Sequence, residues 1–165
     1  QSSGIIVNPE VASMLSNLGA GKKEFRYAIF KITDREVVLE SAVTQNELGA
    51  IDDDYADSSK ATFEKFAQDL KTRTNSFSDC RYAIFDFKFT SVRMGAGVAK
   101  MGKLVFVQLC PDGASIKARM LYASSASALK NALGSVKLLQ FQVTDESEMS
   151  HATLLVKLRE LYGDN

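Results

Sequence analysis

The chain has 165 residues, of which 45% are hydrophobic and 24% are charged, and its 20 Lys and Arg residues balance its 20 Asp and Glu residues. This length fits one domain with a single well-buried core, so we expect one folded domain over residues 1–165. Zero net charge gives no general attraction to nucleic acid or to an anionic membrane, and no stretch approaches the roughly 18 apolar residues of a membrane span, so we expect a cytoplasmic protein with no nucleic acid partner and no stable membrane association.

The first part of the chain predicts a helix and then a β-hairpin. Asn8 is a good helix cap, and Pro9 is tolerated in a first turn. The apolar residues that follow recur at helical spacing until two glycines end the pattern: Val11, Met14, Leu15, Leu18, Gly19 and Gly21. The apolar runs 25–32 and 37–43 flank a short polar turn, which is typical of two antiparallel strands.

A polar segment, residues 44–57, separates this hairpin from a second helix. Its acidic run at residues 52–57 lacks the mid-loop glycine and the closing glutamate of a calcium-binding loop, so we interpret it as a solvated loop. The helix after it is indicated by apolar residues at i, i+3, i+4 and i+7, with Ser58 or Ser59 near its cap. These apolar residues are Phe63, Phe66, Ala67 and Leu70.

Residues 80–90 and 104–110 predict two further strands. The first has one apolar face, and the second is almost continuously apolar, as in a central strand. The glycine-containing residues 95–97 lie between the strands and do not open a helix, so they indicate a long hairpin tip rather than a phosphate-binding loop. The apolar face of the first strand consists of Ala83, Phe85, Phe87 and Phe89.

The last part of the chain predicts a helix at residues 114–133, a strand at 138–143 and a helix at 147–161. The final helix has an apolar stripe made of Met149, Ala152, Leu155, Leu158 and Leu161. The order of elements is therefore αββαββαβα. Hairpins combined with a strand-helix-strand crossover indicate an α/β (α+β) fold, with a mixed central sheet of about five strands and helices on both faces.

The residue types needed for catalysis or metal binding are scarce. His151 is the only histidine, and nothing in the sequence places a serine or an acid beside it for a catalytic triad. One histidine and two distant cysteines do not form a metal-ligand cluster. Cys80 and Cys110 lie in strand-like contexts, and we expect reduced thiols that serve packing. We therefore expect no enzyme, no metal and no cofactor.

The helix at residues 114–133 has cations where a helix favours acids. Lys117 and Arg119 lie in its first turns, where the helix dipole favours Asp or Glu by about 0.3 to 1 kcal/mol each. We expect Ile116, Met120 and Ala123 to pack on the sheet, on a side of the helix that continues towards Leu129 and Leu133. The neighbouring strip mixes Lys117 with apolar and small residues, namely Met120, Leu121 and Ser124. This strip suits docking into a partner's groove, although a solvent-exposed surface could tolerate the same small penalty.

Four segments of the sequence resemble one known family. They are "SSGIIVNPEV", "DCRYAIFDFKF", "KLVFVQLCPD" and "PDGASIKARMLYASSASALKNAL". Together they are similar to ADF/cofilin, the actin-depolymerising proteins of the ADF-homology fold, and the likeness runs over residues 3–162. The part around residues 120–125 is highly specific for this family.

The resemblance implies a non-enzymatic, monomeric regulator that binds actin monomers and filaments, severs filaments and promotes depolymerisation. It places the monomer-binding site at Ser3, Gly4, Ile5, Ile6, Lys117, Arg119, Met120 and Ser124. It places the filament-binding site at Arg93, Lys100, Lys103, Lys157 and Arg159. It also implies inhibitory phosphorylation of Ser3 and inhibition by phosphoinositides that compete for the basic residues.

Several alternatives stay open at this point. One is an ADF-homology relative that binds only filament sides or a branch-nucleating complex without severing; such proteins usually lack the "SSG" arm that this chain has. For the basic hairpin tip around Lys100 and Lys103, the residues alone allow either a solubilising loop or a finger for an acidic surface. The alternative of a small hydrolase lacks the residues it would need.

Overall fold

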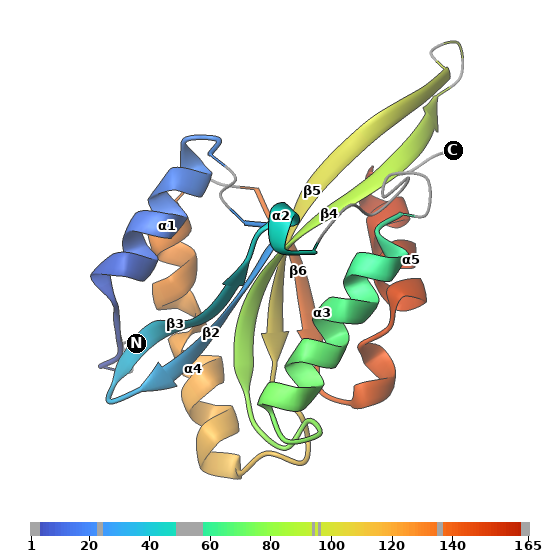
Figure 1. Cartoon of the computed structure of the whole chain (residues 1–165). Helices are drawn as coiled ribbons and strands as arrows, with labels where there is room; N and C mark the ends of the chain where they lie inside the picture. The colour runs from blue at the N-terminus through green and yellow to red at the C-terminus, as the bar shows by residue number, and fades with distance from the viewer. Residues whose placement is uncertain are drawn as a thin grey trace.

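The computed structural model describes residues 4–22, 25–48, 58–93, 95, 97–134 and 137–162. Within these residues, six strands form one mixed sheet in the order β1-β3-β2-β4-β5-β6, with helices on both faces (Figure 1). The strands are β1 Ile6–Val7, β2 Tyr27–Thr33, β3 Glu36–Val43, β4 Arg81–Arg93, β5 Gly97–Leu109 and β6 Leu139–Val143. The helices are α1 Pro9–Gly19, α2 Gln45–Leu48, α3 Lys60–Arg73, α4 Ile116–Leu133 and α5 His151–Tyr162. The predicted fold class is confirmed.

The N-terminal helix and hairpin form as the sequence predicts. The Asn8 side chain accepts a hydrogen bond from the backbone N–H of Glu10 at 2.8 Å, which satisfies one of the free donors at the start of α1. Strands β2 and β3 pair in an antiparallel manner from Tyr27↔Val43 to Thr33↔Glu36. The short strand β1 is an addition to the prediction. It pairs with β3 in parallel, and two residues are too short to give a periodic signal.

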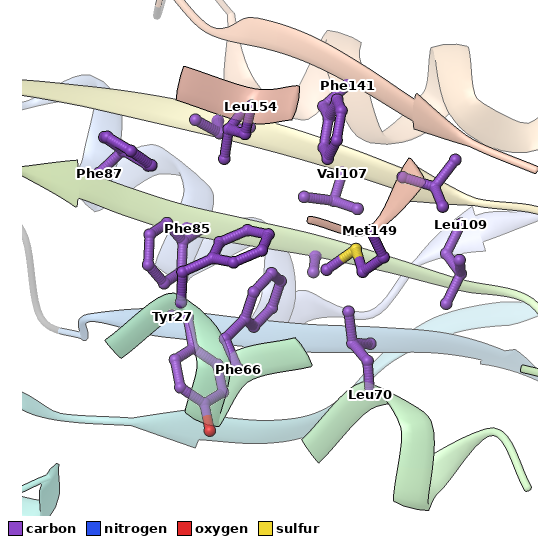
Figure 2. Close-up of a cluster of buried hydrophobic side chains, with 14 of the residues drawn as sticks. Tyr27, Phe66, Leu70, Phe85, Phe87, Val107, Leu109, Phe141, Met149 and Leu154 are labelled. Carbon is purple, nitrogen blue, oxygen red and sulfur yellow. The ribbon is translucent and has the colours of Figure 1, made fainter. Parts of the chain in front are cut away.

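The sheet buries side chains on both faces. Helices α3 and α5 cover one face, and there Phe66 and Leu70 point towards Phe85 and its neighbours (Figure 2). Helices α1 and α4 cover the opposite face. The predicted apolar face of β4 lies in the first of these two clusters, as its alternation indicates: Ala83, Phe85, Phe87 and Phe89.

The first turn of α3 differs from the prediction. Ser59 stands at the cap position with a positive φ of 60°, but its side chain does not cap the helix. Its hydroxyl accepts hydrogen bonds from Lys88 N and Arg26 Nη2 and donates one to Lys88 O. Ser59 therefore ties α3 to strand β4 and to the buried side chain of Arg26. The short helix α2 lies in the polar segment 44–57, for which the sequence predicts no helix.

Strands β4 and β5 are longer than predicted. Their antiparallel pairing runs without interruption from Arg81↔Leu109 to Arg93↔Gly97. The outer part of this hairpin extends beyond the helices (Figure 1). Gly97, with φ 71°, has a left-handed conformation that glycine adopts without strain, which agrees with a hairpin tip at residues 95–97.

The last helix begins later than predicted, and this changes its buried face. A 3₁₀ turn occupies Glu146–Glu148, and α5 starts at His151. Leu154 and Leu158 are fully buried, whereas Ala152 is exposed. The expected stripe is wrong at Ala152 because it was counted from Met149, which is buried but precedes the helix. Among the described residues, none of the helices is both long and apolar enough to cross a membrane.

Candidate functional site

Helix α4 begins with a side-chain cap that offsets its unfavourable charges. The Ser115 hydroxyl accepts a hydrogen bond from the backbone N–H of Ala118 at 3.0 Å. The first turn contains no acidic residue and does contain Lys117. Such a cap contributes about 1 kcal/mol, which is enough to offset one cation near the positive end of the helix dipole.

The buried face of α4 differs from the prediction in the N-terminal half of the helix. Ile116 and Met120 are 67% and 66% exposed, and Ala123 is also exposed. The expectation that these three residues pack on the sheet is therefore wrong. Leu129 and Leu133 are buried, as the sequence predicts, and the buried stripe also contains Tyr122, Ser125 and Ala126.

The exposed face of α4 combines apolar groups with a cation. We call Ile116, Lys117, Met120, Ala123 and Ser124 the α4 ridge; all five are exposed. The spacings of three and four place them along one side of the helix. Large apolar side chains are costly to leave in water, at about 25 cal/mol per Å² of apolar area, so a ridge of this kind gains free energy when another surface covers it.

Arg119 lies at the edge of the α4 ridge and is only partly accessible. Its side chain is 36% exposed, and its Nη1 lies 3.8 Å from Asp112 Oδ1. Its Nε is buried and has no hydrogen-bond partner among the residues that the structure describes. Lys117 is thus the more accessible of the two predicted cations, while Arg119 is partly committed to the loop before the helix.

The predicted N-terminal site residues do not all face solvent. Strand β1 contacts α4, so this segment lies beside the helix. Gly4 is exposed and Ile6 is 62% exposed, but Ile5 is only 9% exposed and belongs to the core beneath α1 and α4. The side chain of Ile5 therefore anchors the segment rather than facing a partner. Ser3 lies outside the described residues.

The five predicted filament-site residues occupy other elements. Lys100 is exposed and Lys103 is half-buried, both on β5. Lys157 and Arg159 are exposed on α5, which covers the sheet face opposite to α4. Arg93 ends strand β4, and the structure does not describe its side chain. The sheet therefore separates the α5 cations from the α4 ridge.

The part of the chain that the structure describes offers few groups for acid-base or metal chemistry. No three His, Cys, Asp or Glu side chains within it form a group that could hold a metal ion. The His151 ring stacks on Phe87 with a centroid distance of 5.7 Å, and its Nε2 lies 2.6 Å from the backbone oxygen of Ser58. This histidine therefore has a packing environment.

Comparisons with known proteins agree along almost the whole chain. The family model described as cofilin/tropomyosin-type actin-binding protein matches residues 4–159. The chain is 60% identical over 154 residues to actin-depolymerizing factor 1, isoforms a/b, of Caenorhabditis elegans, which covers 93% of this chain and 73% of that protein. It is 34% identical over 158 residues to the cofilin of Schizosaccharomyces pombe, over 94% of this chain and 96% of that one.

A solved structure extends this likeness to the fold. The solution structure of the ADF-like UNC-60A protein of Caenorhabditis elegans superposes with a TM-score of 0.80. It is 60% identical in sequence, and the match covers 99% of both chains.

Proposed function

Since the chain belongs to the ADF/cofilin family, whose members are non-enzymatic actin-binding proteins, we propose that it binds actin and promotes the depolymerisation of actin filaments. The single observation that carries this proposal is the α4 ridge. Ile116 and Met120 are exposed on either side of the Lys117 position, on a helix whose opposite side is packed on the sheet. An apolar centre with a charged rim is the arrangement that a helix needs to bind in a groove.

The proposed surface for actin monomers consists of the α4 ridge together with Arg119 at its edge and the exposed residues Gly4 and Ile6 beside it. Contact between β1 and α4 supports a continuous surface. Its apolar members would supply buried area, and Lys117 would supply attraction to an acidic partner and select its orientation. The proposed surface for a neighbouring subunit in the filament is separate: Arg93, Lys100 and Lys103 on the hairpin, and Lys157 and Arg159 on α5.

Filament severing would follow from binding two subunits at once. A monomeric protein with one surface for each subunit can strain the contact between them, because both sets of contacts must form on the same rigid sheet. The long uninterrupted pairing of β4 and β5 supports a rigid hairpin, which would hold Lys100 and Lys103 in a fixed position on the sheet. The second candidate is a protein of the ADF-homology fold that does not sever filaments. Such a protein would bind only to the sides of filaments or to a branch-nucleating complex.

A filament-pelleting assay with purified actin tests the proposed function. We expect the protein to appear in the pellet with the filaments and the amount of actin in the supernatant to rise. Pelleting without a rise in supernatant actin would favour the side-binding alternative. Absence from the pellet together with unchanged supernatant actin would refute the proposal.

Replacing Lys100 and Lys103 together by alanine should reduce severing and spare monomer binding. Both lysines lie on β5, away from the α4 ridge, so their loss should act only on the filament-side contact. We expect the number of cuts per filament length in fluorescence movies to fall several-fold. Affinity for actin monomers should stay within about twofold, or about 0.4 kcal/mol.

A control with the same change in net charge isolates the hairpin. Lys60 and Lys65 are exposed on α3, and their double alanine variant should sever at the normal frequency. A normal cut frequency in the Lys100 and Lys103 variant would reject the hairpin assignment.

We also propose that phosphorylation of Ser3 and binding of phosphoinositides switch the protein off. Ser3 lies three residues before β1, the strand that contacts α4, so a phosphate of about −1.5 to −2 charges would weaken attraction to an acidic partner. Phosphoinositide headgroups would compete for the same cations. Both effects would act on a protein free in the cytoplasm.

The variant Ser3→Glu should weaken monomer binding by about tenfold, or about 1.4 kcal/mol. The reason is the added negative charge, which would weaken attraction to an acidic partner. The measurement is a titration of fluorescently labelled actin monomers. Ser13→Glu, at an exposed position on α1, adds the same charge elsewhere and should bind normally. Full affinity in Ser3→Glu would count against a charge switch at this position.

A further inference from the structure

The two cysteines face each other at one end of the long β4–β5 hairpin. The last pair of the ladder at that end is Arg81↔Leu109. Cys80 precedes Arg81 and Cys110 follows Leu109, so the two cysteines are opposite each other one position further along. Both are free thiols in the structure. The two cysteines are about thirty positions apart in the sequence, so no short cysteine motif predicts that they lie close together.

The backbone hydrogen bonds show which type of cross-strand pair this is. The N–H of Cys110 donates to Val143 O of β6 at 2.9 Å, so the backbone of this residue faces β6 rather than β4. In an antiparallel sheet, opposite residues that do not exchange hydrogen bonds have Cα atoms about 4.5 Å apart. Disulfides span Cα distances of about 4.4 to 6.8 Å. The position of the pair is therefore compatible with a covalent bridge.

The side chains of the two cysteines also lie on the same face of the sheet. Cys80 belongs to the core cluster under α1 and α4, and Cys110 packs against that cluster. The Cys80 and Cys110 thiols each shift the pKa of the other, as two thiols that lie close together do.

The environments of the two thiols differ in a way that separates their roles. The hydrogen bond from Cys80 lowers the pKa of Cys110 to about 7 although burial opposes it, and Gln108 and the positive charge of Arg119 act in the same direction. The hydrogen bond to Cys110 and burial raise the pKa of Cys80. Cys110 is half-exposed, whereas Cys80 is fully buried. An accessible thiolate beside a buried thiol is the usual arrangement of an attacking and a resolving cysteine.

We propose that Cys110 and Cys80 form an oxidation site, which a peroxide converts into an intramolecular disulfide. The Cys110 thiolate attacks one oxygen of hydrogen peroxide, the O–O bond breaks, and a sulfenic acid and hydroxide form. The Cys80 thiol then loses its proton, and its sulfur attacks the Cys110 sulfur. The S–S bond forms as the S–O bond breaks. Two thiols are oxidised, and one peroxide is reduced to two waters.

The bridge would lie directly before the α4 ridge in the chain. Cys110 is joined to the first turn of α4 by residues 111–115, and Arg119 on that helix contributes to the charge around the Cys110 sulfur. Oxidation removes the negative charge of the thiolate from the neighbourhood of Arg119. Oxidation of the two cysteines would therefore change the charge around Arg119 at the start of α4.

Mass spectrometry of the full chain tests the oxidation site without reference to actin. The reduced protein is treated with one equivalent of hydrogen peroxide, denatured in excess iodoacetamide and digested without reductant. We expect no alkylated cysteine, a mass lower by two hydrogen atoms, a linked peptide pair that contains Cys80 and Cys110, and reversal by dithiothreitol. Alkylation of both cysteines, or disulfides only between molecules, would overturn the proposal.

Two single variants test the separate roles. In Cys80→Ser, peroxide should produce a sulfenic acid on Cys110 that dimedone traps, because the resolving thiol is gone. In Cys110→Ser, the rate of peroxide consumption should fall at least about tenfold, because the buried thiol keeps its proton. Circular dichroism verifies that both variants fold. Dimedone labelling of Cys80 in Cys110→Ser at the rate of Cys110 in Cys80→Ser would contradict the assigned order of attack.

Discussion

Replacing Lys117 and Met120 together by alanine is expected to weaken the binding of actin monomers by about 3 kcal/mol, or more than about a hundredfold in Kd. The reason is that both side chains are exposed in the free protein and would become buried at the centre of the interface. Central apolar and charged anchors contribute most of the binding free energy in protein interfaces. A titration of fluorescently labelled actin monomers measures the change.

The same double variant should leave the fold unchanged. Neither side chain takes part in the buried stripe of α4, so we expect the free energy of unfolding to change by less than about 0.5 kcal/mol. A substitution of Arg119 would be a less specific test of binding. Its buried Nε and its proximity to Asp112 would mix a loss of packing with a loss of binding.

A matched pair on α5 provides the control. Val156 is 57% exposed and Lys157 is exposed beside it, so their double alanine variant removes one apolar group and one cation from a different surface. It should bind monomers within about twofold of the unmodified protein. Equal losses in both variants would show that the effect is not specific to the α4 ridge, and normal binding by the Lys117 and Met120 variant would refute the proposed surface.

The periodicity of the sequence was sufficient to predict the sheet and its two helical layers, because those elements bury long regular stripes. The alternation of Phe85, Phe87 and Phe89 placed one face of β4 correctly in the core. The 3.6-residue spacing of Phe63, Phe66 and Leu70 did the same for α3. Shorter elements had no such signal. Strand β1 has two residues and α2 has four, and both are held by contacts with distant parts of the chain.

Helix α4 shows why a functional face can mislead a prediction from hydrophobicity. In the N-terminal half of the helix, the spacing of Ile116 and Met120 predicts a packed side, whereas Tyr122, Ser125 and Ala126 are the buried residues. Periodicity alone assigns large apolar residues such as Ile116 and Met120 to the core. A surface that binds another protein must carry apolar groups too, so the two cases look the same in the sequence. The family resemblance implied a contact role for Met120, whereas the exposure of Ile116 became visible only in the structure.

The site as a whole was predictable only in part. Lys117, Met120 and Ser124 lie on one exposed surface, as the resemblance implies. Ile5 lies in the same segment but is buried, because adjacent residues of a strand point to opposite sides. The pairing of Cys80 with Cys110 depends on strand register, which the sequence does not specify at that distance.

Tyr122→Ala should lower the free energy of unfolding by about 4 kcal/mol, because it removes the side chain that fixes α4 to the sheet. Tyr122 is buried, and its ring lies 5.0 Å from that of Tyr82. Its hydroxyl accepts a hydrogen bond from Ile32 N at 2.9 Å, and its backbone oxygen accepts one from the Tyr82 hydroxyl. Alanine would leave a cavity beneath the helix and leave the Ile32 N–H without its partner.

Tyr122→Phe separates these two contributions, because it keeps the ring and removes only the hydroxyl. It should cost about 1 kcal/mol, the usual net contribution of one hydrogen bond. Urea unfolding followed by circular dichroism measures both variants. If Tyr122→Ala were no more destabilising than Tyr122→Phe, α4 would be held mainly by Ala126, Leu129 and Leu133. The α4 ridge would then depend on the C-terminal half of the helix for its position, although the ridge itself lies in the N-terminal half.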